Sequence, residues 1–123
     1  MSCMYNRQNL GKWGEELACE YLEDMNYNIV ERNFRCHQGE VDIVAYDNTC
    51  NELVFVEVKT RSNFNYGVPT ESINYIKKNH MKRSIEYYLY KKHLFNVYVR
   101  VDAIEIVVWK GKYKLNHLKG VFE

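Results

Sequence analysis

Three ionisable side chains interrupt two otherwise apolar segments of the sequence. Asp42 lies in EVDIVAYD, and Glu57 and Lys59 lie in LVFVEVKT. Two carboxylates that approach each other in a partly buried setting need a proton, a base or a metal ion between them. Lys59 is one candidate for the base, and a hard divalent cation with oxygen ligands is the other candidate. The alternative is a cluster of charges at a sheet end with a purely structural role, because structural ion pairs also perturb the pKa values of such groups.

The spacing of the two segments predicts that Asp42 and Glu57 face each other across a hairpin. Both segments have the composition of buried strands, and the intervening NTCN, residues 48–51, suits a tight hairpin loop. With that loop, Asp47 pairs with Glu52, and Asp42 falls opposite Glu57. Cross-strand neighbours have Cβ atoms about 4.5–5.5 Å apart, so two like charges at these positions repel each other.

The net charge of +1 hides a strong difference between the two halves of the chain. Residues 1–57 carry 11 acidic and 4 basic side chains, whereas residues 58–123 carry 5 acidic and 13 basic ones. Basic side chains can neutralise phosphates, which favours a nucleic-acid partner, although a solvated basic helix face is the alternative. The basic residues that we expect to contact nucleic acid are Lys77, Lys78, Lys82, Arg83 and Arg61.

Lys77 stands out because it falls within the apolar stripe of the second expected helix, near Met81 and Tyr88. A lysine at such a position either extends its ammonium group to the helix end or meets an acid. Since Lys77 lies in the first turns of that helix, it can reach the carboxylate cluster or a bound phosphate.

Composition limits the class of protein. A chain of 123 residues with 46% hydrophobic and 27% charged residues fits one globular domain, residues 1–123. One proline and six glycines exclude collagen-like and low-complexity chains. No apolar run approaches the ~20 residues of a membrane span, and no signal-peptide core is present, so we expect a cytoplasmic protein without a membrane partner.

The four cysteines form no C-x-x-C pair, which disfavours a zinc ribbon and favours free thiols.

Hydrophobic periodicity predicts the element order α-β-β-β-α-β-β. The first helix has Asn9 as its N-cap and Met25 at the end of its apolar stripe, and a short strand over 28–34 precedes the hairpin. A loop over 62–70 leads to a second helix, capped by Ser72 and ending near residue 93. A long β stretch over 95–109, bent or broken near Asp102, is followed by a turn at 110–112 and a strand over 113–118.

Two further groups of polar residues have simpler interpretations. Arg100 and Asp102 share one strand face, which predicts a simple ion pair of the surface type. His80 and His117 are expected to be packing or surface residues rather than ligands.

GEVDIVAYD, a short loop and LVFVEVKTR together resemble the D-x(n)-E-x-K signature of restriction-endonuclease-like nucleases. The wider pattern resembles the YraN-type family of uncharacterised bacterial proteins in that superfamily, which also holds Holliday-junction resolvases. The similarity covers nearly the whole chain and includes ERNF at 31–34, GVP at 67–69, RVD at 100–102 and HL at 117–118. Two departures are Val41, where the superfamily's nominal motif has proline, and Lys78, where an amide side chain is expected.

The resemblance implies an α/β fold with a restriction-endonuclease-like core, a mixed central sheet flanked by helices. It also implies that Asp42, Glu57 and the backbone carbonyl of Val58 bind Mg²⁺ or Mn²⁺. Lys59 would position or deprotonate the attacking water, and Glu15 would add a carboxylate from the first helix, as the equivalent helix does in resolvases. A homodimer is expected on the same analogy.

Three functions are compatible with these observations. The first is a metal-dependent nuclease that hydrolyses phosphodiester bonds of DNA, with branched or damaged DNA among its candidate substrates. The second is a nucleic-acid-binding module that keeps the nuclease fold without cleaving. The third is an interaction protein whose acidic cluster is structural. The intact set of Asp42, Glu57 and Lys59 favours the first over the second, and the uneven charge favours both over the third.

Overall fold

The computed structural model describes residues 7–62 and 75–122, which form two helices and five strands. Their order confirms the sequence α-β-β-β-α-β-β. The predicted N-cap Ser72 and most of the predicted 62–70 loop lie outside the described residues. The elements are α1 (Arg7–Asp24), β1 (Tyr27–Cys36), β2 (Gly39–Asp47), β3 (Glu52–Arg61), α2 (Tyr75–Lys91), β4 (Tyr98–Trp109) and β5 (Lys112–Leu118).

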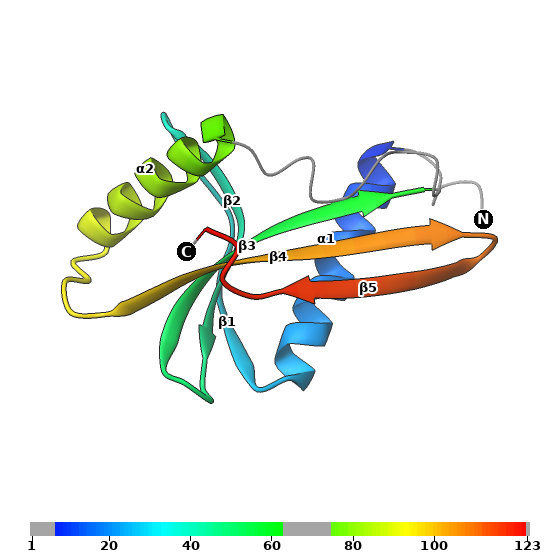
Figure 1. Ribbon diagram of the computed structural model, residues 1–123, viewed down its shortest axis with the longest axis horizontal. Helices are drawn as coiled ribbons and strands as arrows, with labels where there is room; N and C mark the ends of the chain where they lie inside the picture. Colours follow the sequence, from blue (N-terminus) through cyan, green and yellow to red (C-terminus); the bar gives the residue numbers. More distant parts are fainter. Residues whose placement is uncertain (1–6, 63–74, 123) are drawn as a thin grey trace.

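The five strands form one mixed sheet in the order β1-β2-β3-β4-β5. Strands β1, β2 and β3 are an antiparallel meander, β3 pairs with β4 in parallel, and β4 pairs with β5 antiparallel. Parallel neighbours need a long crossover connection, and α2 lies in the one between β3 and β4. The mixed sheet flanked by helices matches the expected fold class, and Figure 1 shows α1 and α2 at different parts of it.

The hairpin register confirms the prediction from the NTCN loop. Asp47 pairs with Glu52, and the described ladder continues to the pair Ile43–Val56. Asp42 and Glu57 are the next residues of the two strands, just past the last described pair. The register therefore brings the two carboxylate-bearing residues to the same end of the hairpin.

Helix α1 packs on one face of the sheet. Leu10, Ala18 and Leu22 of the helix bury against Val54 and Val56 of β3 in a shared apolar cluster. Gly14 makes this close approach possible, because a Cβ at that position would collide with the side chain of Thr60.

Helix α2 packs on the opposite face. Met81, Ile85 and Tyr88 are buried against a cluster that includes Phe34 and Phe55. Both phenylalanine rings meet the ring of Tyr88 edge to face, with centroids 5.0 and 5.4 Å away.

Two predicted details of α1 are wrong. The described helix spans Arg7–Asp24, so Asn9 is a helical residue and not the N-cap, which is consistent with the good helix propensity of Arg7 and Gln8. Met25 is 51% exposed, because the helix ends at Asp24 and Asn26 takes a left-handed φ of 71°. Met25 therefore lies at the very end of the helix and is absent from the apolar cluster that α1 shares with the sheet.

Strand β4 is continuous from Tyr98 to Trp109 and keeps an unshifted register with β3, so the break considered at Asp102 is absent. Asp102 is fully buried, and its carboxylate accepts hydrogen bonds from Arg100 at 2.8 and 3.0 Å and from the backbone N–H of Gly120 at 3.1 Å. His117 Nε2 lies 2.7 Å from the same carboxylate. These partners satisfy a charged side chain inside the sheet layer, so the strand continues.

The expected surface ion pair between Arg100 and Asp102 is instead the centre of a buried network. Arg100 also contacts Glu52 at 2.9 Å, Asp47 at 3.1 Å and the Tyr27 hydroxyl at 2.7 Å. Burial would raise the pKa of Asp102, but hydrogen bonds from His117, Arg100 and Gly120 outweigh it and lower that pKa.

The three described cysteines, Cys19, Cys36 and Cys50, carry free thiols, as expected. Neither described helix is long and apolar enough to cross a membrane.

Candidate functional site

A cavity of about 390 Å³ lies where β2, β3 and α2 meet. It brings together the residues singled out by the sequence: Asp42, Glu57, Val58 and Lys59 from the hairpin, with Lys77 from the helix. The wall is completed by Gly39, Glu40, His80, Met81 and Ser84.

Gly39 gives the start of β2 a backbone conformation that favours glycine at the edge of this cavity. Its φ of 145° belongs to a region that side chains rarely adopt, and a Cβ there would lie 3.4 Å from the Ser84 hydroxyl. The glycine of the GEVD motif therefore shapes the entry of β2, three residues before Asp42.

Asp42 is fixed by a backbone hydrogen bond. The N–H of Val58 donates to Asp42 Oδ2 at 2.8 Å, which ties the carboxylate to β3. Burial raises the pKa of Asp42 to about 6, against the lowering effect of that hydrogen bond. The negative charges of Glu15, Glu57 and Glu40 raise it further. The charged form of this carboxylate is therefore disfavoured, mainly by burial and in part by the neighbouring carboxylates.

Glu57 is engaged by two lysines. Lys77 Nζ lies 2.6 Å from Glu57 Oε1, and Lys59 Nζ lies 3.7 Å from the same oxygen. The prediction that Lys77 reaches the carboxylate cluster is confirmed. These ion pairs are partly buried, since the side chain of Glu57 is only 19% exposed.

The two lysines differ in how firmly they hold their protons. The pKa of Lys59 is lowered by its hydrogen bond with Lys77, by burial and by the positive charge of Lys77. Burial is the largest single effect on Lys77 and lowers its pKa, but the hydrogen bonds to Glu57 and Lys59 and the negative charges of Glu57 and Asp42 together outweigh it and raise that pKa. Lys59 is therefore the lysine better suited to release a proton, and Lys77 is the one better suited to carry a permanent charge.

The oxygen atoms of these residues are of the chemical type that binds a divalent cation. Two carboxylates and a backbone carbonyl are hard oxygen donors of the type that Mg²⁺ and Mn²⁺ prefer. Burial, with a smaller contribution from neighbouring carboxylates, raises the pKa of Asp42, and a cation beside it would stabilise its charged form. Within residues 7–62 and 75–122, no three side chains of His, Cys, Asp or Glu are grouped as a metal centre. A cation would therefore also need the Val58 carbonyl, water or a substrate oxygen.

Glu15 does not line the cavity. Burial raises the pKa of Glu15, and its charge in turn raises that of Asp42, so Glu15 belongs to the surrounding electrostatic field. The structure thus brings Glu15 towards the cluster without placing it in the cavity wall.

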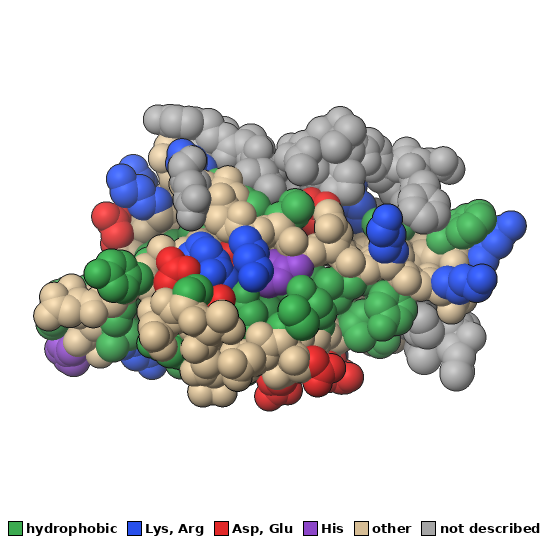
Figure 2. All heavy atoms as spheres, turned by 60° about the horizontal axis from the view of Figure 1, so that its bottom comes forward, with side chains coloured by type: hydrophobic (Ala, Val, Ile, Leu, Met, Phe, Trp, Pro, Cys, Tyr) green, Lys and Arg blue, Asp and Glu red, His purple; other side chains and the backbone are tan. Residues whose placement is uncertain are grey.

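The predicted nucleic-acid-binding residues are spread over several parts of the molecule. Lys77 is in the cavity, whereas Lys78 and Lys82 line a second, more apolar cavity of about 250 Å³ between α2 and β4. Arg83 is exposed on the same helix, and Arg61 ends β3 beside Glu105. Figure 2 shows basic and acidic side chains intermixed near the centre of one face and further basic side chains at its right end.

Comparison with known proteins shows the family. Residues 14–106 match the profile described as "Uncharacterised protein family UPF0102". The chain belongs to this family. A UPF0102 protein of Caldicellulosiruptor saccharolyticus is 46% identical, covering 95% of this chain and 99% of its own length. A UPF0102 protein of Clostridium botulinum is 39% identical, covering 97% of this chain and 98% of its own.

UPF0102 membership confirms the family resemblance seen in the sequence. Among solved structures, "Crystal structure of SSO0001" overlaps 95% of this chain and 54% of that one, with 18% identity and a TM-score of 0.40. This overlap is too loose to bear on function.

Three residues near the candidate site received no functional role from the sequence. His80 and Ser84 line the cavity from α2, and their spacing of four residues is the signal that places them on one helix face with Lys77. Glu105 is buried on β4, opposite Lys59 in the parallel register. Its pairing with β3 depends on the crossover, which no local pattern reveals.

Proposed function

We propose that this chain is a metal-dependent nuclease that hydrolyses phosphodiester bonds of DNA. The observation that carries the proposal is the convergence of Asp42, Glu57 and Lys59 on one cavity, with a half-buried Asp42 whose pKa is raised to about 6. These are the residues of the D-x(n)-E-x-K signature.

Each residue has a role that follows from its surroundings. Asp42, Glu57 and the Val58 carbonyl would hold the Mg²⁺ or Mn²⁺. When bound, the cation would polarise a phosphate oxygen and lower the pKa of a water molecule. Lys59, with its lowered pKa, would orient the attacking water or take its proton and would offset charge on the phosphate. Lys77 would offer a permanent positive charge to the substrate phosphate.

The proposed substrate is DNA, with branched or damaged forms as the first to examine. The basic second half of the chain supports a polyanionic partner, since 13 of its residues are Lys or Arg. The proposed contacts are Lys77, Lys78, Lys82, Arg83 and Arg61.

The second candidate is a module that binds nucleic acid without cleaving it. The Lys77–Glu57 ion pair favours this alternative, because an ammonium group already neutralises one proposed metal ligand. The two functions share a binding surface and differ only in whether the cavity accepts a cation.

Cleavage of a panel of linear, nicked, flap and four-way DNA with Mg²⁺ or Mn²⁺ tests the proposal. The wild type should cleave at least one substrate, and Glu57→Gln and Lys59→Ala should lose this activity. The variant Lys12→Gln, which changes an exposed lysine of α1, is the control and should cleave like the wild type. Binding without cleavage under every condition would favour the second candidate.

A further inference from the structure

The sheet face that carries the proposed site continues onto the β4–β5 hairpin. Glu57 pairs with Ala103 and Lys59 with Glu105 in the parallel ladder, so odd-numbered residues of β4 share their face. In the antiparallel ladder, Val107 pairs with Lys114 and Trp109 with Lys112. Lys112 and Lys114 therefore lie on the same face as Glu57 and Lys59.

Contacts with the helices support this assignment. The opposite face of the hairpin packs with α1, since Ile106, Val108 and Leu115 belong to its apolar cluster and Tyr113 meets Trp13 edge to face. Helix α2 packs mainly over β1 and β2. Lys112 and Lys114 are exposed.

The hairpin end projects and is basic. The last described pair of β3 with β4 is Arg61–Val107, and β4 continues to Trp109. Lys110 Nζ lies 4.8 Å from the centroid of the Trp109 ring, which holds a third ammonium group at the turn. In the described part of the chain, the lysines in ion pairs with carboxylates are Lys59, Lys77 and Lys92, and not those of this turn.

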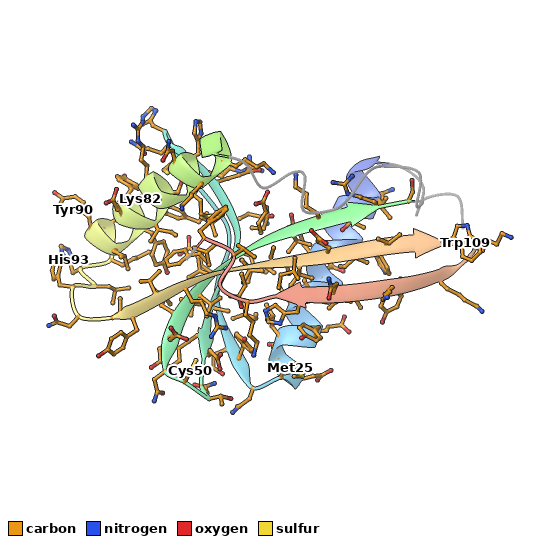
Figure 3. All side chains as sticks on the ribbon, in the orientation of Figure 1. Met25, Cys50, Lys82, Tyr90, His93 and Trp109 are labelled. Atoms are coloured by element: carbon orange, nitrogen blue, oxygen red, sulfur yellow. The ribbon has the colours of Figure 1, made fainter. Side chains whose placement is uncertain are left out.

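The hairpin end is well separated from the basic part of α2. Figure 3 shows Lys82 on α2 and Trp109 at the far end of the hairpin, towards opposite ends of the long axis. Along β3, Phe55 lies under α2, Glu57 and Lys59 lie in the cavity, and Arg61 is the last residue before the projecting end. The cavity is thus flanked by positive charge on two sides.

We infer that Lys112 and Lys114, with Lys110 at the turn, bind the nucleic-acid phosphate backbone on the side of the cavity away from α2. The inference rests on the proposed function, which it deepens by adding a second surface. From Glu105, beside Lys59, to Trp109 is four residues, or about 13 Å at the rise of a strand. That length corresponds to about four nucleotides of one strand of a duplex. The hairpin would hold the backbone a few nucleotides from the reacting phosphate.

Salt-dependent binding tests the surface without any cleavage. Binding of a fluorescent 20-base-pair duplex is measured in EDTA between 50 and 200 mM KCl for the wild type and for Lys112→Gln/Lys114→Gln. The matched control is Lys12→Gln/Lys119→Gln, which removes the same charge from two exposed lysines elsewhere. Each lost phosphate contact should flatten the slope of log K against log salt by about 0.9 and weaken binding roughly tenfold at 50 mM salt.

The hairpin variant should therefore lose about 1.8 from the slope, and the control variant should bind like the wild type. Equal effects of both variants, an unchanged hairpin variant, or no binding by the wild type would overturn the inference. Thermal unfolding of each variant checks that the exposed changes leave the fold intact. Cleavage by the wild type with an unaffected hairpin variant would reject this surface alone. A hairpin-dependent slope without cleavage would reject the nuclease and keep the surface.

Discussion

Asp42 keeps a carboxyl group where its charge is disfavoured. Burial and three neighbouring carboxylates raise its pKa to about 6, although the Val58 N–H donates a hydrogen bond to it. Proteins maintain such a group at a cost in stability, and ionisable groups with perturbed pKa values are concentrated at functional sites. The energetic signature of the site is thus measurable in a protein without metal.

Asp42→Asn should stabilise the protein at pH 8 in EDTA and should have little effect at pH 4. The raised pKa means that the protonated carboxyl favours the folded state, so its contribution is present below about pH 4 and is lost as the pH rises through about 6. The two-unit difference corresponds to about 3 kcal/mol as an upper figure. Asparagine removes the charge and keeps an oxygen for the Val58 N–H.

Urea unfolding at both pH values measures the change. Asp24→Asn, at an exposed position, is the control and should shift the free energy of unfolding by less than about 0.5 kcal/mol at either pH. A wild type as stable as Asp42→Asn at pH 8 would show that the carboxylate is not destabilised by its surroundings.

Helix α1 contains two glycines, Gly11 and Gly14, and only Gly14 is needed for its close contact with the sheet. Gly14 faces Thr60 of β3, where a Cβ would collide with the threonine side chain, whereas a Cβ on Gly11 would meet nothing within 4 Å. Both lie in the same helix, so they differ in packing and share the same helical backbone.

Gly14→Ala should destabilise the protein by about 1–3 kcal/mol, because overpacking forces the helix away from the sheet. Gly11→Ala should instead stabilise it by about 0.5–1 kcal/mol, since alanine is the better helix former. Chemical denaturation of both variants gives the comparison. Adding Thr60→Ala to Gly14→Ala should restore part of the loss, and two variants of equal stability would contradict the packing argument.

The sequence predicted correctly those features that depend on residues close together in the chain. The NTCN loop sets the register of β2 and β3, and that register brings Asp42 and Glu57 to one end of the hairpin. The N-terminus of α1 was misplaced at Asn9, because capping preferences are weak when the preceding residues also favour helix. Lys77 was recognised because a charge in an apolar stripe needs a partner.

The Arg100 network joins parts of the chain that lie far apart in sequence. Its members come from α1 (Tyr21), β1 (Tyr27), the β2–β3 hairpin (Asp47 and Glu52), β4 (Asp102) and β5 (His117). The alternation of side chains along the strand predicted that Arg100 and Asp102 share one face, but it did not predict that both are buried. Burial there depends on tertiary partners at distant positions, which no window of the sequence contains.

Arg100→Met should destabilise the protein by about 3–5 kcal/mol, because it leaves the fully buried Asp102 without its main counter-charge. Arg35→Met is the matched control, since Arg35 pairs with Glu40 at 3.5 Å on the surface, with side chains 77% and 61% exposed. The control should change stability by less than about 1 kcal/mol. Similar losses in both variants, measured by urea unfolding, would show that the network has no special weight.

The Lys77–Glu57 ion pair would couple the binding of metal and DNA in the proposed nuclease. A cation arriving at Glu57 competes with the ammonium of Lys77, whereas a phosphate attracts that ammonium away from the carboxylate. Each ligand would then tighten the other, and the coupling free energy must be the same in both directions.

Titration calorimetry of Mg²⁺ with and without DNA measures this cooperativity, using Lys59→Ala to prevent cleavage. Adding Lys77→Met should tighten metal binding in the absence of DNA and reduce the tightening that DNA causes. Unchanged cooperativity in that variant would mean that Lys77 is only a structural partner of Glu57. With the lysine in place, the protein would hold its metal weakly until nucleic acid arrives, so that the hydrolytic site assembles on its substrate.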